Sequence, residues 1–134
     1  MGFALNNSVL LVDDSTDLLD LLKLTIEYHC RCKAITAENL AQVEANRDEV
    51  MRCRLAILDI NLGADQPNGI HVYQWLRAGG FVGEIAFLTG HAANHPLVAD
   101  AAKIGDARVF NKPLAAKDLL KLVDGGQTYV SRFF

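Results

Sequence analysis

Short apolar runs alternate with longer segments of helical period along the chain. Residues 9–12, 55–60 and 85–89 are almost continuously apolar, as expected for strands that are buried on both faces. Alternation of such strands with helical segments is typical of a parallel sheet with helices on both sides. The pattern predicts five strands, at residues 9–12, 32–36, 55–60, 85–89 and 107–110.

The segments between the predicted strands carry start and stop signals for five helices. Ser15 can cap the first helix, in which Leu18, Leu22 and Ile26 share one face. Pro96 fits the first turn of the fourth helix, where a missing amide hydrogen costs nothing. The other predicted boundaries are a start at Asn39, a helix over 70–78, an end near Gly105 and an end at Gly125 and Gly126.

Composition and charge restrict the function classes. The 134 residues suit one domain, and the chain is 51% hydrophobic and 22% charged with a net charge of −3. Because there is no basic surplus, direct nucleic-acid binding is not expected. No apolar run approaches the roughly 20 residues that span a bilayer, so we expect no membrane insertion and a cytoplasmic location.

The cysteines point to a reducing compartment. There are three, which is an odd number and too few for a disulfide framework. His29, Cys30 and Cys32 resemble part of a metal site, but a structural zinc needs four ligands and no second cluster supplies the remainder. We interpret this segment as a packed junction between a helix and a strand.

Chemically active side chains follow the predicted strands. In a doubly wound sheet the functional crevice lies outside the carboxyl ends of the strands. Asp13 and Asp14 follow the first strand, and Asp59 lies at the end of the third. Thr89 closes the fourth strand and Lys112 follows the fifth. We therefore expect three carboxylates, one hydroxyl and one ammonium at one edge of the sheet.

These residue types predict phosphoryl chemistry with a divalent metal. Converging carboxylates are driven toward protonation unless a cation compensates them, and hard oxygen ligands suit Mg²⁺. Asp13, Asp14 and Asp59 therefore form a candidate Mg²⁺ site. Lys112 can neutralise phosphoryl oxygens, and Thr89 adds a hydrogen-bond donor. Asp59, held at the end of a central strand, is the candidate nucleophile that forms an aspartyl-phosphate.

The combined pattern resembles the receiver domains of bacterial two-component response regulators. The resemblance rests on VDD at 12–14, LAILDIN at 55–61, LTG at 88–90, A-x-x-G from Ala102 to Gly105 and NKPL at 111–114. It implies a flavodoxin-like α/β fold, a doubly wound (βα)5 with a five-stranded parallel sheet in the order 2-1-3-4-5. It further implies a single receiver domain over 1–134, with a core at about 8–124, a C-terminal tail at 125–134 and no output domain.

The resemblance assigns roles to the site residues. Asp59 would accept a phosphoryl group from a histidine kinase or a histidine phosphotransfer protein. Asp13 and Asp14 would hold Mg²⁺ directly or through water, together with Asp59 and the backbone carbonyl of Asn61. Thr89 and Lys112 would contact the phosphoryl oxygens, and the Lys112–Pro113 peptide bond would be cis.

The implied function is that of a stand-alone response regulator that catalyses only its own phosphorylation and dephosphorylation. It would bind a downstream protein target when phosphorylated, through its fourth helix, fifth strand and fifth helix. A dimer on activation, no membrane association and no direct nucleic-acid contact are further expectations. The apolar tail TYVSRFF, at residues 128–134, is expected to fold back on its own domain or to anchor a partner.

The sequence departs from the family pattern in the switch and in one loop. Receivers commonly carry an aromatic residue three positions before the lysine, and this residue acts as a switch by turning inward when the threonine moves. This chain has Val109 at that position. Phe110 should face the opposite side of the strand, so we expect a signal to pass through the loop after Thr89 and the next helix. The loop over 61–69 is longer than usual. His91 is either an exposed loop histidine or a residue that influences phosphoryl loss.

Three other interpretations stay open. A degenerate receiver would serve as a phosphorylation-independent interaction module, although the complete set of site residues argues against it. A small Mg²⁺-dependent phosphatase with an aspartyl intermediate would call for a second aspartate at position 61, where Asn61 stands. A flavodoxin-like flavin site is disfavoured because Asp13 and Asp14 would repel the cofactor phosphate.

Overall fold

Five parallel strands form one sheet in a computed structural model that describes residues 5–91 and 94–124. The strand order is β2-β1-β3-β4-β5, which confirms the predicted fold class. Each strand lies within one residue of its predicted position at either end. The strands are β1 (Ser8–Val12), β2 (Lys33–Ala37), β3 (Leu55–Asp59), β4 (Glu84–Thr89) and β5 (Ala107–Asn111).

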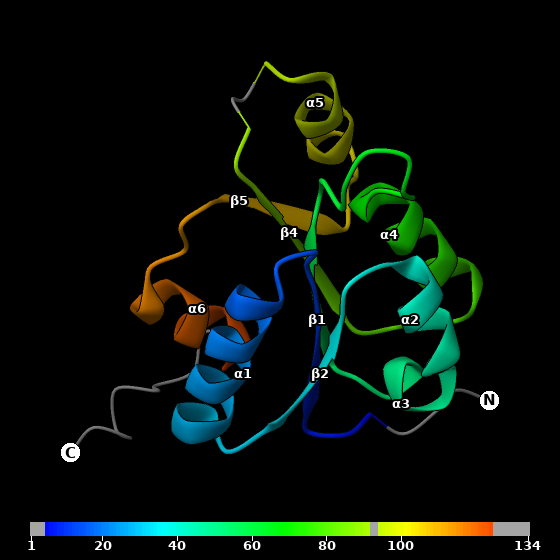
Figure 1. The fold of residues 1–134 in the computed structure, drawn as a ribbon. Helices are drawn as coiled ribbons and strands as arrows, with labels where there is room; N and C mark the ends of the chain where they lie inside the picture. The colour runs from blue at the N-terminus through cyan, green and yellow to red at the C-terminus, as the bar shows by residue number, and fades with distance from the viewer. Residues whose placement is uncertain (1–4, 92–93, 125–134) are drawn as a thin grey trace.

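Helices cover both faces of this sheet. Figure 1 shows α1 and α6 on one side and the other helices on the opposite side, with α5 near the carboxyl end of β4. Because the crossovers are right-handed, the connection from β1 to β2 lies on one face, and the connections from β2 through β5, which run the other way along the sheet, lie on the opposite face. The helices are α1 (Thr16–Cys30), α2 (Leu40–Ala45), α3 (Arg47–Met51), α4 (Gly69–Ala78), α5 (Pro96–Ala102) and α6 (Ala116–Val123).

Alternate residues of each central strand enter two separate hydrophobic cores. Leu10 and Leu58 point toward α2–α5, whereas Leu11 and Ile57 point toward α1 and α6. All five residues of both β1 and β3 are buried, because side chains alternate across a strand and both faces are covered. The apolar runs in the sequence are therefore continuous because their alternate residues line the two opposite faces of the sheet, both of which are buried.

The connection after β2 differs from the single helix that the sequence predicts. Asn39 does cap α2, with its side chain accepting from the backbone N–H of Gln42 at 2.9 Å. Asn46 then leaves helical geometry, with φ −109° and ψ 29°, and its side chain donates to the carbonyl of Gln42 at 3.0 Å. A side chain that bonds to the backbone in this way competes with the helix, so α2 ends and α3 begins separately.

Several predicted boundaries agree with the structure. Ser15 accepts from the backbone of Leu18 at 3.2 Å, and Pro96 occupies the first turn of α5. Cys30 and Cys32 are buried and form no disulfide, which confirms the packed junction between α1 and β2. The predicted helix stop at 125–126 and the tail at 128–134 lie outside the described residues.

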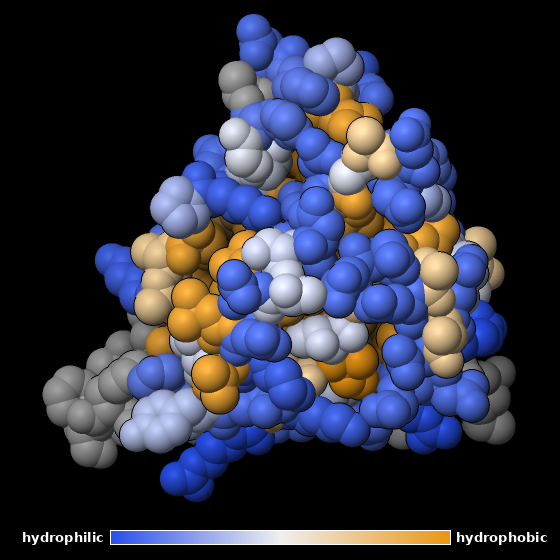
Figure 2. Space-filling view, in the orientation of Figure 1, coloured by the Kyte–Doolittle hydropathy of each residue, from blue (hydrophilic) through white to orange (hydrophobic). Residues whose placement is uncertain are grey.

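The outer face of α1 carries apolar side chains. Leu21, Leu24 and Tyr28 are exposed and recur at helical spacing, and Figure 2 shows apolar residues gathered over α1 and α6. The inner face of the same helix, with Leu19, Leu22 and Ile26 among its residues, is buried. In the part of the chain that the structure describes, no helix combines the length and apolar character needed to cross a membrane.

The start of α4 lies against the end of β3. The backbone N–H of Gly69 donates to the carbonyl of Ile60 at 2.8 Å. A Cβ atom at position 69 would lie 2.3 Å from the backbone oxygen of Asp59, which no real contact permits. Glycine at this position therefore allows the helix to close on the strand end that carries the site.

Replacing Gly69 by alanine should destabilise the domain, because backbone atoms rather than a flexible side chain occupy the space. We expect Gly69→Ala to lower the free energy of unfolding by about 2 to 3 kcal/mol. Urea denaturation followed by circular dichroism measures this. Gly105→Ala is the control, since nothing lies within 4 Å of its Cβ position. Equal stability of the two variants would contradict the close approach.

Candidate functional site

Three carboxylates meet at the carboxyl end of the sheet. One oxygen from each of Asp13, Asp14 and Asp59 lies within 4.8 Å of the others. Asp13 and Asp59 are buried, with 2% and 5% of their surface exposed, whereas Asp14 faces solvent. The structure thus brings together all three aspartates that the sequence indicated, with one open side.

The register of the sheet explains this convergence. The last residue of β1 pairs with Leu58, so Asp13 leaves β1 beside Asp59 of β3. Thr89 ends β4 and pairs with Asn111, the last residue of β5. Parallel strands have their carboxyl ends at one edge, and each strand here ends at nearly the same level. Residues from four distant parts of the sequence therefore share one site.

The ammonium group of Lys112 links the two buried carboxylates. Its Nζ lies 2.8 Å from Asp13 Oδ2 and 3.1 Å from Asp59 Oδ2. The backbone N–H of Lys112 donates to the Thr89 carbonyl at 2.8 Å, and the Lys112–Pro113 peptide bond is cis, as expected. Charges this close and this buried interact far more strongly than a surface ion pair. Lys112 is therefore held in contact with the two buried carboxylates of the site.

The electrostatic environment of the site keeps Lys112 charged and makes ionisation of Asp59 unfavourable. Burial, and then the charge of Asp13, raise the pKa of Asp59 to about 6, against the opposing effect of Lys112. Burial disfavours the charged form of Lys112, but the hydrogen bond to Asp13 and the attraction of both carboxylates outweigh it and raise the lysine pKa. At neutral pH the ammonium is charged, and Asp59 is ionised at an energetic cost.

The donor set fits Mg²⁺. This ion takes oxygen ligands, keeps several waters and is bound by few carboxylates, and the site offers three carboxylates with a solvent-facing side. Three negative charges face one positive charge here, so two negative charges remain for a divalent cation to balance. Asn61, the predicted backbone ligand, lies two residues after Asp59, and its N–H donates to Asp59 Oδ1 at 3.3 Å.

The side chain of Asn61 joins the two loops that border the site. Its Oδ1 accepts from the backbone N–H of Gly63 at 3.0 Å, which directs Nδ2 away from Gly63. That Nδ2 lies 3.2 Å from Nε2 of His91. Because an amide nitrogen only donates, the His91 nitrogen accepts in this contact. His91 is half-buried, so it is neither a free loop histidine nor remote from the site.

Thr89 connects to the same loop. Its side chain is 1% exposed, and its Oγ1 accepts from the backbone N–H of His91 at 3.0 Å. The rings of His91 and His95 stack at 4.2 Å between centroids and 15° between planes. His95 Nδ1 in turn accepts from the backbone N–H of Leu97 and caps α5. A continuous set of contacts therefore runs from Thr89 to the start of α5.

Sequence reasoning missed the histidine stack. Nothing in the spacing of His91 and His95 along the sequence indicates that their rings meet. The alternation in β5 was predicted correctly. Val109 packs with the core beneath α2–α5, whereas Phe110 packs with the core beneath α1 and α6. No aromatic residue of β5 therefore faces the side on which the family pattern places its switch.

The raised pKa of Asp59 gives a pH-dependent stability effect. The folded pKa of about 6 exceeds the ordinary value of 3.8, so the contribution of Asp59 to stability is full below pH 4 and lost as pH rises through 6. Without divalent cations, we expect Asp59→Asn to be more stable than wild type by about 1 to 3 kcal/mol at pH 7.5. The gain should shrink at pH 4.5.

Urea denaturation in chelator at both pH values measures this difference. Asp20→Asn, which changes an exposed aspartate of α1, is the matched control and should show little change at either pH. A gain for Asp59→Asn that is the same at both pH values would refute the buried-charge explanation.

Comparison with solved structures agrees with the fold. A response regulator receiver domain protein from Clostridium thermocellum has a TM-score of 0.74 at 18% identity, over 98% of this chain and 100% of that one. A CheY-like receiver domain protein from Methanospirillum hungatei has a TM-score of 0.76 at 22% identity, covering 97% and 98%. Chemotaxis protein CheY4 of Vibrio cholerae has 0.73 at 21%, covering 92% and 100%.

Sequence comparison identifies the family. No curated protein matches the chain significantly. Residues 9–124, however, match the family model of the response regulator receiver domain, and this range contains all the site residues described above. Receiver domains are signalling domains of two-component systems that generally bind Mg²⁺ at an acidic pocket. The chain belongs to the response regulator receiver domain family.

Proposed function

We propose that Asp59 is the phosphoacceptor of this receiver domain. The observation that carries the proposal is the position of its carboxylate, which is buried at a strand end, clustered with two aspartates and 3.1 Å from an ammonium. Such a carboxylate is rigidly placed, and its environment is prepared for an incoming group with several anionic oxygens. Asp13 and Asp14 lie beyond the end of β1, whereas Asp59 is the last residue of β3, the middle strand of the sheet.

The proposed reaction transfers a phosphoryl group from a phosphohistidine on a histidine kinase or histidine phosphotransfer protein. An Asp59 oxygen attacks phosphorus, a phosphorus–oxygen bond forms, the phosphorus–nitrogen bond breaks, and the donor histidine takes up a proton. Such transfers depend mainly on positioning and charge stabilisation. Lys112 is placed to pair with a phosphoryl oxygen, and the Thr89 hydroxyl to donate to another.

Asp13, Asp14, Asp59 and the backbone carbonyl of Asn61 would hold Mg²⁺, which when bound supplies positive charge against the phosphoryl oxygens. Asp14, the exposed member, is the side chain most accessible to an incoming ion. Asp13 and Asp59 already contact the Lys112 ammonium. On phosphorylation, Lys112 would exchange part of this contact for contact with the phosphoryl group.

The alternatives fit the site less well. A degenerate receiver has no need for two buried carboxylates and a lysine in mutual contact, since such an arrangement stabilises the fold poorly. A phosphatase with an aspartyl intermediate needs an acid beside the nucleophile, and the side chain of Asn61 is instead engaged with Gly63 and His91.

We further propose that the signal leaves the site through α5. The Thr89 hydroxyl, on turning to a phosphoryl oxygen, would release the N–H of His91. The stacked rings of His91 and His95 would then carry the displacement to the N-cap of α5. The output face proposed for a downstream protein consists of α5, β5 and α6. This route replaces the aromatic switch, since Val109 stands at its position.

Intact-mass spectrometry after incubation with acetyl phosphate tests the phosphoacceptor. We expect wild type to gain one phosphoryl group with Mg²⁺ and none in chelator, because the site needs a divalent charge. Asp59→Asn should gain none. Asp65→Asn should behave as wild type, since Asp65 is an exposed aspartate in the adjoining loop and lies outside the acidic cluster.

A gain by Asp59→Asn equal to that of wild type would refute the assignment. If wild type gains nothing from acetyl phosphate or from phosphorylated histidine phosphotransfer proteins, the degenerate receiver becomes the better description.

Two substitutions at His95 separate its stacking from its capping. His95→Asn keeps an N-cap acceptor but removes the ring, so we expect little loss of stability and a smaller phosphorylation-induced shift at the Val98 amide. His95→Phe keeps a ring but removes the acceptor, so we expect a loss of about 1 kcal/mol and a retained shift. Urea denaturation and amide NMR measure the two effects. Equal NMR responses of both variants and wild type would exclude the histidine stack from the route.

A further inference from the structure

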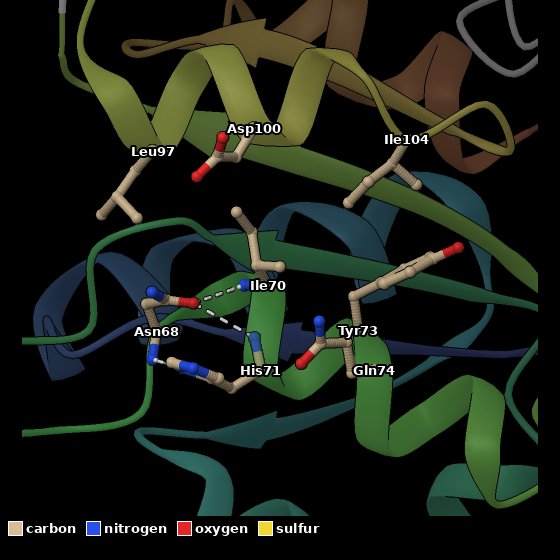
Figure 3. A pocket seen from close by; sticks show the side chains of 8 residues that line it. All are labelled: Asn68, Ile70, His71, Tyr73, Gln74, Leu97, Asp100 and Ile104. Atoms are coloured by element: carbon tan, nitrogen blue, oxygen red, sulfur yellow. Dashed lines mark hydrogen bonds between the residues drawn. The ribbon is translucent and has the colours of Figure 1, made fainter.

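A groove of about 370 Å³ lies between α4 and α5, outside the acidic site. Figure 3 shows side chains from both helices facing each other across it. This volume lies at the lower end of the range for ligand pockets and suits one large side chain rather than a whole cofactor. The lining residues are Asn68, Ile70, His71, Tyr73, Gln74, Leu97, Asp100 and Ile104.

Four apolar side chains form part of the groove wall. Ile70 and Tyr73 come from α4, Leu97 belongs to α5, and Ile104 follows it. All four are partly buried and pack against the core beneath α2–α5, so one side of each is fixed. Their remaining surfaces face the groove. A ligand with an apolar stem would bury part of these surfaces without displacing a core side chain.

Most polar groups of the groove already have partners. Asn68 Oδ1 accepts from the backbone of α4, and His71 Nδ1 accepts from the backbone N–H of Asn68 at 3.0 Å. The Tyr73 hydroxyl donates to Asp106. The side chains of Gln74 and Asp100 differ, since neither forms a hydrogen bond or an ion pair with any described residue, although both line the groove.

The charge without a partner in the groove is therefore negative. Asp100 is the only acidic residue among the lining residues, and no lysine or arginine lies among them. Nearby Asp106 is already paired with Arg77 at 2.9 Å. A carboxylate beside partly exposed apolar side chains is complementary to a cation on an apolar stem, a combination that occurs in the long basic side chains.

We propose that this groove receives an arginine side chain of a partner protein. The three methylenes of arginine would lie on Ile70 and Ile104, and the guanidinium would meet Asp100. A guanidinium has five donors in a planar fork, so it can bond both oxygens of the Asp100 carboxylate at once. Its weaker hydration also favours it over the lysine ammonium at a partly apolar site. The proposal does not depend on phosphorylation of Asp59.

NMR titration with Nα-acetyl-arginine N-methylamide tests the site on the full chain. We expect saturable shifts at the methyl groups of Ile70, Leu97 and Ile104 and at the Asp100 amide, with a dissociation constant on the order of millimolar for so small a probe. The matched probe is the blocked citrulline, which has the same shape and no charge. It should bind about fivefold or more weakly, and added salt should weaken only the arginine probe.

Substitutions test whether the Asp100 carboxylate is responsible for the binding. Asp100→Asn should weaken the arginine probe to the level of the citrulline probe, and its exposed position should leave the fold unchanged. Asp118→Asn, an exposed aspartate on α6, should leave binding unchanged. Leu97→Ser should weaken both probes, because it removes apolar surface and no charge.

Four results would overturn the proposal. They are equal binding of both blocked probes, tighter binding of blocked lysine than of blocked arginine, shifts centred elsewhere on the surface, and no saturable shift at any soluble probe concentration. Each is read from the amide and methyl spectra of wild type, so none depends on the outcome of the acetyl phosphate experiment.

Discussion

The contact of one ammonium with two buried carboxylates is the constraint on which the site depends. Lys112 lies within 3.1 Å of both Asp13 and Asp59, at a depth where water screens charge poorly. The ammonium lets both carboxylates stay in the fold, but it balances only one of them. Burial, and then the charge of Asp13, raise the pKa of Asp59. A site built in this way is not optimised for stability; it is arranged to take a cation and an anionic group together.

Holding that imbalance requires a rigid frame, which the two hydrophobic layers supply. β1 and β3 are buried along their whole length, so the ends that carry Asp13 and Asp59 cannot move apart without disturbing both cores. The start of α4 closes on the end of β3 at Gly69. Packing of apolar groups thus opposes the repulsion between carboxylates, and the strand register converts a linear sequence into a compact acidic cluster.

The strands and the site edge were predictable because each rests on local or topological rules. Continuous apolar runs identified the central strands, and parallel topology placed Asp13, Asp59, Thr89 and Lys112 at one edge. The break at Asn46 was not foreseen, since it depends on which acceptor one amide side chain selects. The stacking of His91 on His95 was not foreseen either, because a loop has no period from which the direction of a ring can be inferred. Side-chain orientation in loops is settled by three-dimensional packing.

The small size of α5 explains why it suits a receiving role. Its seven residues are too few to be stable alone, so its position depends on contacts at its ends and along its side. At its start, the His95 ring both caps it and stacks on His91 beside the acidic site. Along its side, Leu97 and Asp100 form one wall of the groove shared with α4. Val98 and Ala101 attach the helix to the core. The proposed phosphorylation route and the proposed arginine groove therefore meet in one element. Because Val109 stands where the family pattern has its aromatic residue, the proposed route runs from Thr89 through α5 instead.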